Sequence, residues 1–183
     1  MINHKLKHRI KKIKRGFLIW KTIILLLVNL WFDNFVFKLF QTNSDKRNKV
    51  QTNRARWFTN QLIELGSAFI KIGQLLSARP DLIPNTWIKE LSKLQDQVPQ
   101  FSFETVEEII KDELGKTFSE INDINTIPIG SASLAQVHKA TLKNGKEVVF
   151  KVQRPNLKNL FIIDLNIMQQ IAYVIQKNKN WSR

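Results

Sequence analysis

Residues 128–153, with the sequence PIGSASLAQVHKATLKNGKEVVFKVQ, decide the fold of this chain. The stretch opens with a run of small residues and continues into two apolar segments that Asn144-Gly145 separates. Two β-branched, apolar segments around an Asn-Gly pair are typical of a β-hairpin. We therefore expect a small-residue loop, a strand, a tight turn and a second strand that carries Lys151.

Side-chain parity chooses between two registers of this hairpin. A two-residue turn at Asn144-Gly145 would place Lys151 on the same face as apolar Leu142. A three-residue loop over 143–145, with Gly145 in the left-handed conformation, keeps the lysine off that face. We predict the three-residue loop, because it separates an apolar core face from a cleft face. The core face then carries Ala140, Leu142, Val148, Phe150 and Val152, and the cleft face carries Val137, Val149 and Lys151.

The same residues follow the spacing of a nucleotide-binding pattern. In kinase-like folds a loop G-x-G-x-x-G-x-V covers the phosphates, and the next strand carries a lysine for the α- and β-phosphates. Here alanine replaces two of the three glycines, so we expect a stiffer loop. Taken singly, the features also fit an ordinary loop and a solvated strand-end lysine. The candidate nucleotide-binding residues are Gly130, Ala132, Ser133, Ala135, Val137, Val149 and Lys151, with the two valines on either side of a flat base.

Two further motifs lie upstream of the hairpin. Residues 69–84 read FIKIGQLLSARPDLIP and residues 93–99 read KLQDQVP. Together with PIGSASLAQVHKA and VVFKVQRP, they resemble the UbiB-type (AarF-like) family of atypical protein-kinase-like proteins, and the upstream pair is most similar to cyanobacterial and plastid members. The resemblance extends over about residues 17–170.

The resemblance implies an α+β fold, in which an N-terminal helical extension accompanies the small antiparallel sheet of a kinase-like N-lobe. It implies that a K-x-G-Q helix, with Lys71, Gly73 and Gln74, lies across the nucleotide cleft and turns its lysine and glutamine inward. ATP is the implied cofactor, with Mg²⁺ in full-length members. From the residues alone, Lys71 and Gln74 lie opposite an apolar stripe over residues 54–78, which also fits a solvated face.

The composition limits which other kinds of site and partner are possible. The 183 residues suffice for one domain with a sizeable core. There is no cysteine, and the three histidines are scattered, so thiol chemistry is excluded and no metal constellation is indicated. The net charge is +14, and no acidic residue precedes Asp33. Such a basic arm predicts attraction to a polyanion, either anionic lipid or nucleic acid.

The apolar stretch over residues 17–40 favours lipid. Its uncharged run, 22–32, is shorter than the roughly 20 residues that cross a bilayer, so we expect a helix that lies in or dips into the membrane interface. A helix packed into the domain core is the alternative. We expect association with an anionic membrane surface on the cytoplasmic side. Nucleic acid is disfavoured as a partner, because the basic arm leads into an apolar helix.

We divide the chain into a basic arm and apolar helix (1–40), a polar linker (41–53), a helical extension (54–125) and a partial N-lobe (126–183). Further helices are predicted at about 85–95, from an N-cap at Ser102 to Leu114, and at about 156–177. Residues 116–129 are expected to form a connection.

This sequence contains few candidates for the acidic residues of an active kinase site. Lys151 of a kinase is held by a helix glutamate, and the one acidic residue after Lys151 is Asp164, which either pairs with it or is an exposed helix charge. No H-R-D-like loop and no D-F-G are present, so no catalytic residue and no metal ligand are named. We expect the chain to stop before the helical lobe and to be inactive alone.

Two functions are compatible with this sequence. The resemblance implies an atypical kinase or ATPase that supports isoprenoid quinone biosynthesis, of the ubiquinone or plastoquinone type, at a membrane. Its implied partners are quinone-biosynthesis proteins or an isoprenoid lipid. The alternative is a non-catalytic, membrane-peripheral binding module or a pseudogene fragment.

Overall fold

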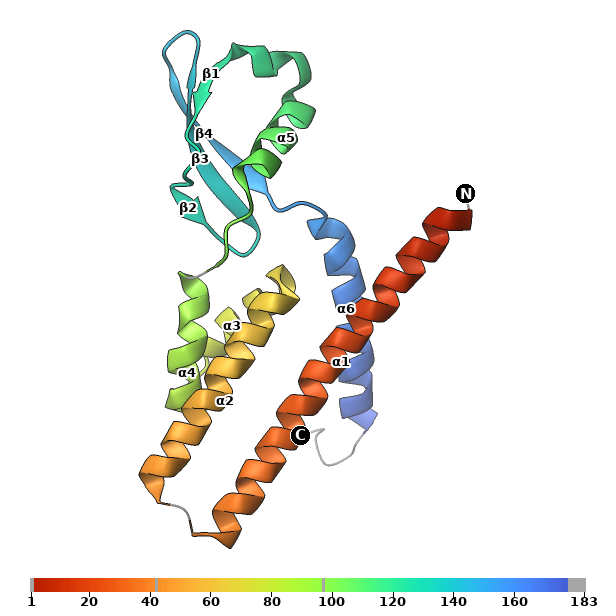
Figure 1. The fold of residues 1–183 in the computed structure, drawn as a ribbon, viewed down its shortest axis with the longest axis vertical. Helices are drawn as coiled ribbons and strands as arrows, with labels where there is room; N and C mark the ends of the chain where they lie inside the picture. Colours follow the sequence, from red (N-terminus) through yellow and green to blue (C-terminus); the bar gives the residue numbers. More distant parts are fainter. Residues whose placement is uncertain (1, 42, 97, 178–183) are drawn as a thin grey trace.

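The structure, a computed structural model, describes residues 2–41, 43–96 and 98–177. It consists of a helical unit and, above it in Figure 1, a sheet unit. The helical unit contains α1 (Ile2–Leu39), α2 (Ser44–Leu65), α3 (Ser67–Ser77), α4 (Asn85–Leu91), the 3₁₀ turn η1 (Ser92–Gln95) and α6 (Leu157–Lys177). The sheet unit contains α5 (Phe103–Leu114), the 3₁₀ turn η2 (Gly115–Glu120), β1 (Ile121–Ile124), β2 (Gly130–Ser131), β3 (Ala135–Leu142) and β4 (Glu147–Gln153). The expected α+β class is confirmed.

The sheet is antiparallel and is built around β3. Strand β4 pairs with β3 over its whole length, while β1 and β2 pair with the other edge of β3. Helix α5 covers one face, where Val106 and Ile110 form a small core with Val152. Side chains alternate between the faces of a strand, so the odd-numbered residues of β3 and β4 lie on the opposite, open face.

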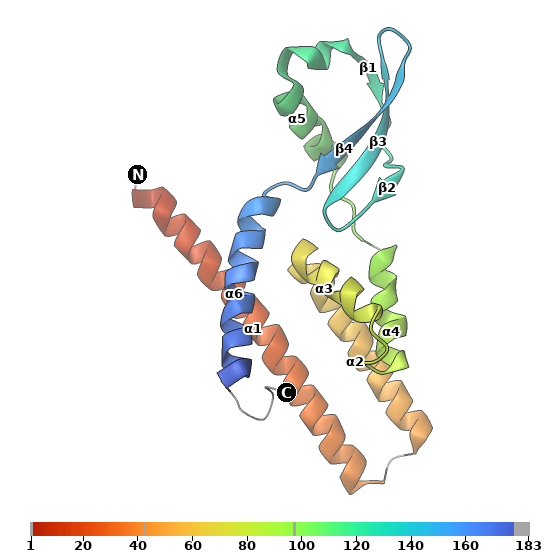
Figure 2. The same cartoon turned by 180° about the vertical axis from the view of Figure 1, so that it is seen from behind.

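The helical unit holds the larger core. Its buried side chains come from every helix of the unit, and they include Ile19 of α1, Leu62 of α2, Phe69 of α3, Leu91 of α4 and Ile167 of α6. Helices α1 and α6 pack side by side, as both views show (Figures 1 and 2), although Arg15 and Asp164, which join them, lie 149 residues apart in the sequence. This core therefore depends on contacts between distant segments.

The predicted polar linker over 41–53 is wrong for most of its length. Helix α2 begins at Ser44, and the Asn43 side chain accepts a hydrogen bond from the amide of Asp45 as an N-cap. The polar residues after it lie mostly on exposed positions of the helix. Only a short turn between α1 and α2 remains.

The apolar stripe predicted over 54–78 continues through a break in the helix. Gly66 has φ +84° and ψ −161°, a region open to glycine alone, and it ends α2 and begins α3. The stripe survives because both helices face the same core.

Downstream, the predicted elements mostly hold. Ser102 caps α5 and Gly115 ends it, as expected. The predicted helices near 85–95 and 156–177 correspond to α4 with η1 and to α6. The connection expected at 116–129 instead contains η2 and strand β1, which pairs with β3.

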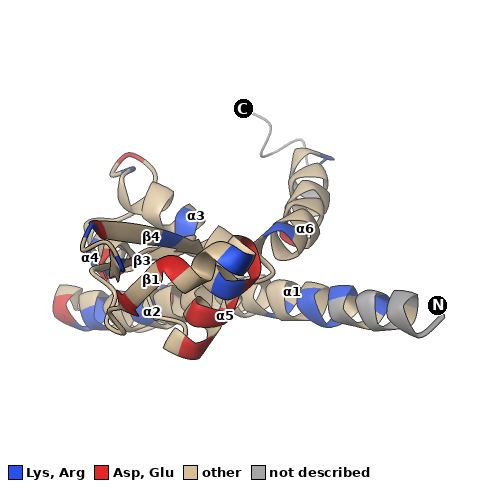
Figure 3. Ribbon diagram, turned by 90° about the horizontal axis from the view of Figure 1, so that it is seen from above, with Lys and Arg blue, Asp and Glu red and all other residues tan. Residues whose placement is uncertain are grey.

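Helix α1 extends much further toward the N-terminus than the expected apolar helix. Its segment Lys12–Leu39 is long and apolar enough to cross a membrane, judged by length and composition only. A narrow face with Ile19 and Thr22 is buried against the other helices, whereas Phe17 and Trp31 are 71% and 69% exposed. Figure 3 shows Lys and Arg gathered along the N-terminal part of this helix.

Candidate functional site

The hairpin has the predicted register. Val137 pairs with Lys151, and the amide of Leu142 donates to the carbonyl of Lys146 at 2.9 Å, which leaves a three-residue loop. Gly145 in that loop has φ +82°, as expected. Val137, Val149 and Lys151 therefore share the open face of the sheet, and the Val149 side chain is 60% exposed there. This face is the candidate site.

The core face is less apolar than the sequence analysis expected. Gln136 and His138 of β3 lie on it and are buried. His138 Nδ1 donates to the carbonyl of Asn125 at 2.8 Å, and Gln136 Nε2 donates to the carbonyl of Phe101 at 3.3 Å. These bonds tie β3 to two segments that precede it in the sequence, and they explain why the two polar groups can be buried.

The small-residue loop at the edge of the site is a tight reversal. Gly130 of β2 pairs with Val137, and the amide of Ala132 donates to the carbonyl of Ala135 at 2.8 Å. The loop contains no residue with positive φ, so its alanines fit without strain. Ala132 is exposed, whereas Ser133 and Ala135 are buried.

The sequence analysis missed the residue that fastens this loop. The guanidinium of Arg154 donates to the carbonyls of Ala132 and Pro99, and it lies over the Phe101 ring at 5.4 Å. The amide of Arg154 also donates to the carbonyl of Leu134 at 2.9 Å. Burial lowers the pKa of this guanidinium, which stays charged because arginine titrates far above neutral pH.

The K-x-G-Q residues lie on α3, in the helical unit. Gly73 is buried where α3 meets α2 and η1, and a Cβ there would lie 2.3 Å from Leu94 Cδ1. Gln74 Nε2 donates to the carbonyl of Leu94 at 2.8 Å, and Lys71 is exposed. Among the described residues, no hydrogen bond joins Lys71 or Gln74 to the candidate site. Leucine side chains, those of Leu62, Leu91 and Leu94, therefore pack against α3 at Gly73.

Both alternatives for Asp164 require correction. Its carboxylate is buried and forms a two-point ion pair with Arg15 of α1, with both N–O distances at 2.8 Å. It is therefore not an exposed helix charge, and Arg15 rather than Lys151 is its partner. Arg15 also donates to the carbonyl of Leu65 and lies over the Phe69 ring at 5.6 Å. The pair joins α1, α6 and the end of α2.

The candidate site suits phosphate better than metal. Lys151 supplies a cation on the open face, and Gly130 of the loop lies across β3 from it, since both residues pair with Val137. The part of the chain that the structure describes contains no group of three or more His, Cys, Asp or Glu side chains that could hold a metal ion. We therefore assign no Mg²⁺ ligands.

A family model matches this part of the chain. Residues 93–182, which include the whole sheet unit, match the ABC1 atypical kinase-like domain. A solved structure, the Rv3197–erythromycin complex from Mycobacterium tuberculosis, is 32% identical with a TM-score of 0.37, and the match covers 62% of this chain and 29% of that chain.

Several curated proteins are similar over most of the chain. The uncharacterized protein sll1770 of Synechocystis is 42% identical over 90% of this chain and 28% of its own length. Protein ACTIVITY OF BC1 COMPLEX KINASE 7, a chloroplast protein of Arabidopsis thaliana, is 41% identical over 92% of this chain and 25% of its own. A probable protein kinase UbiB of Shewanella denitrificans is 45% identical over 62% and 21%.

The chain thus spans about a quarter of the length of the first two of these relatives. The expected likeness to cyanobacterial and plastid members is confirmed, since Synechocystis and chloroplast proteins are among the matches. The motifs in the hairpin and on α3, the matched domain and these relatives lead to one conclusion: the chain belongs to the ABC1/UbiB family of atypical kinase-like proteins.

Proposed function

We propose that the open face of the sheet covers the nucleotide in an atypical kinase or ATPase of the ABC1 type. The observation that carries this proposal is the hairpin register, which puts Lys151 opposite Val137 and beside Val149 on a face that α5 leaves open. A base can lie against the two valines, and the ammonium group of Lys151 can bind its phosphates.

The residues of this chain would bind and orient the nucleotide. Arg154 keeps the loop fixed by holding the carbonyl of Ala132, so the loop would keep its shape when a phosphate group binds beside it. ATP, when bound, supplies the phosphoryl group. The described residues offer no carboxylate cluster for a metal, so we expect no phosphoryl transfer by this chain alone.

The test is a titration of the chain with ATP, in which calorimetry measures binding. Lys151→Ala is expected to abolish binding, because it removes the one cation of the site that comes from β4. Lys146→Ala, at an exposed position directly after the hairpin loop, is the matched control and should bind as the wild type does. Equal binding by both variants would contradict the site, and magnesium-dependent ATP turnover that Lys151→Ala abolishes would contradict the expected inactivity.

We further propose that the chain works at an anionic membrane surface on the cytoplasmic side, in isoprenoid quinone biosynthesis. The large exposed apolar side chains of α1 and the basic residues along its N-terminal part support the membrane proposal. The quinone pathway rests on the family resemblance, and quinone-biosynthesis proteins or an isoprenoid lipid would be the partners.

The same exposed side chains favour a second candidate, a membrane-peripheral module without turnover. Vesicle co-sedimentation tests the membrane contact that both candidates share. Deleting residues 1–40 would also remove the buried Ile19, so surface substitutions are the cleaner test. Phe17→Glu with Trp31→Glu should release the chain from anionic vesicles, while Leu82→Glu, 58% exposed on a loop, should not. Unchanged, salt-insensitive binding would contradict the membrane contact.

A further inference from the structure

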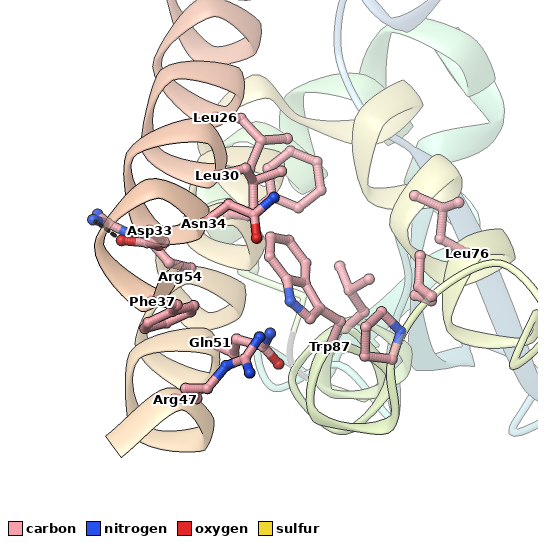
Figure 4. A pocket seen from close by; sticks show the side chains of 14 residues that line it. Leu26, Leu30, Asp33, Asn34, Phe37, Arg47, Gln51, Arg54, Leu76 and Trp87 are labelled. Atoms are coloured by element: carbon pink, nitrogen blue, oxygen red, sulfur yellow. Dashed lines mark hydrogen bonds and ion pairs between the residues drawn. The ribbon is translucent and has the colours of Figure 1, made fainter. Parts of the chain in front are cut away.

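A pocket lies between α1, α2 and α4, in the helical unit and away from the candidate nucleotide site (Figure 4). Its volume of about 470 Å³ lies within the range of small-molecule sites, roughly 300–1,000 Å³. Its wall is mostly apolar and includes Leu26, Leu30, Phe58, Leu76 and Leu91. A ligand here would bury an apolar body of substantial size.

Besides an ion pair between Asp33 and Arg54, four polar side chains line this pocket. Asn34 comes from α1, Arg47 and Gln51 come from α2, and Trp87 comes from α4. Within the described parts of the chain, no hydrogen bond or ion pair is found for the polar side-chain atoms of these four residues. Figure 4 shows the ends of Asn34, Gln51 and Arg47 on the side of the pocket that faces Trp87. Polar groups that converge on an apolar pocket without protein partners are typical of a binding site.

The charged residues in the pocket wall indicate which charge a ligand should carry. The carboxylate in its wall belongs to Asp33, and Arg54 neutralises it with two hydrogen bonds of 2.8 and 3.1 Å. The hydrogen bond to Asp33 raises the pKa of Arg54, which keeps this guanidinium charged. The remaining charge in the wall is the guanidinium of Arg47, which lies over the Phe37 ring at 5.0 Å. The pocket therefore favours an anion.

We propose that this pocket binds an amphipathic lipid that has one apolar chain and an acidic head group. The head group would accept hydrogen bonds from Arg47 and from the indole N–H of Trp87, both of which can only donate, and from the amide of Gln51. The apolar chain of the lipid would lie against Leu30 and the other leucines of the wall.

The position of the pocket suits an occupant that arrives from a membrane surface. Helix α1 supplies one wall of the pocket, and the same helix exposes Leu27 and Trp31 to solvent. A lipid could pass from a bilayer along α1 into the pocket without crossing the sheet unit. The inference does not depend on the proposed nucleotide site, so either can fail without the other.

The test titrates the full chain with decyl phosphate, below the concentration at which it forms micelles, and measures binding by calorimetry. One molecule is expected to bind per chain, whereas inorganic phosphate alone and decanol alone should bind at least tenfold more weakly. Arg47→Gln should weaken decyl phosphate about tenfold, the loss of one charge-assisted contact. Lys49→Gln, an exposed residue of the same helix outside the pocket wall, is the matched control and should bind normally.

A second variant tests the apolar wall of the pocket, against which the lipid's apolar chain would lie. Leu30→Trp fills the pocket from α1 and should abolish binding of decyl phosphate, with circular dichroism used to verify folding. Leu27→Trp, 56% exposed on the same helix and outside the wall, should leave it unchanged. Binding of several molecules per chain, equal loss in Arg47→Gln and Lys49→Gln, or full binding by a folded Leu30→Trp would overturn the proposal. So would self-association of the chain that Leu30→Trp abolishes, because a second copy would then be the occupant.

Discussion

The helical unit and the sheet unit are built in opposite ways. The helical core draws buried side chains from α1, α2, α3, α4 and α6, whereas the hydrophobic cluster under the sheet has three buried apolar side chains and a rim of half-buried ones. Strands β3 and β4 are neighbours in the sequence and pair over seven positions. Arg15 of α1 and Asp164 of α6 lie 149 residues apart in the sequence and form an ion pair whose carboxylate is buried. Long-range contacts therefore stabilise one unit, and local pairing stabilises the other.

This difference matters for function. A sheet that is covered on one face by α5 keeps its other face available, and that face carries Val137, Val149 and Lys151. The helical unit carries the K-x-G-Q residues, but it uses Gln74 and Gly73 for its own packing. Perturbing each unit separately should show whether the site depends on the helices.

The largest expected effect comes from Asp164→Ala in the helical unit. The substitution leaves Arg15, whose side chain is only 14% exposed, without its carboxylate, so the free energy of unfolding should fall by about 3 kcal/mol. Urea titration measures this loss. Amide hydrogen exchange should become faster in α1 and α6 but not in β3 and β4, because the ion pair lies outside the sheet unit.

Asp81→Asn is the matched control for that experiment. Asp81 pairs with Arg79 at 2.6 Å on the surface, where water screens the interaction, so no measurable change in stability is expected. If Asp164→Ala were as harmless as the control, the ion pair would not join α1 to α6, and the contrast between the two units would be wrong.

The second prediction concerns the packing of α3. Gly73→Val should destabilise the chain by about 2 kcal/mol, because its Cβ would lie 2.3 Å from Leu94 Cδ1 and 2.8 Å from Leu62 Cδ1, in a filled core. Gly16→Ala on α1 is the control. The nearest atom to its Cβ would be Ile167 Cδ1 at 3.9 Å, so the gain in helix propensity should raise stability by up to about 1 kcal/mol. Thermal unfolding of both variants compares them, and a neutral Gly73→Val would contradict the packing.

The sheet unit was predictable because its information is local. Parity of the residues around Asn144-Gly145 was enough to give the register, since a slip of one residue would move Lys151 to the core face. Ser102 and Gly115 likewise lie next to the helix that they limit. Strand β1 escaped notice because it is only four residues long and its middle residues are polar.

The helical unit was harder to predict because its decisive contacts join distant residues. No local pattern connects Asp164 with Arg15, so spacing alone left a choice between a partner of Lys151 and a solvated charge. The first half of α2 is polar because few of its side chains reach the core, and a polar segment resembles a linker. Gly66 lies within an unbroken apolar stripe, so periodicity did not indicate the break.

The third prediction perturbs the sheet unit. Gly145→Val should destabilise the chain by about 1 kcal/mol, because Gly145 has φ +82° and a β-branched residue is strained there. No atom lies within 4 Å of the added Cβ, so backbone strain alone would account for the loss. Gly145→Asn should recover part of it, since asparagine tolerates the left-handed region. Equal effects of Val and Asn in urea titrations would show that the loop does not require positive φ.

The smallest expected effect is a pH dependence that belongs to the helical unit. Burial alone would raise the pKa of Glu90 on α4, but the ion pairs with Lys93 at 2.6 Å and with Arg56 at 3.6 Å outweigh it and lower that pKa below 4.5. A carboxyl whose pKa is lower in the folded state contributes stability above its unfolded pKa and loses it as the pH falls through the folded value. The free energy of unfolding should therefore decline from about pH 5 to pH 3, and less steeply in Glu90→Gln.

Glu104→Gln on α5 is the comparison in the sheet unit, where hydrogen bonds from its own backbone and from Ser102 lower the pKa of an exposed carboxyl. Because water already solvates that group, its removal should change the slope less than Glu90→Gln does. Parallel urea titrations across this pH range decide the matter, and a slope that depends on Glu104 but not on Glu90 would reverse the comparison between the two units.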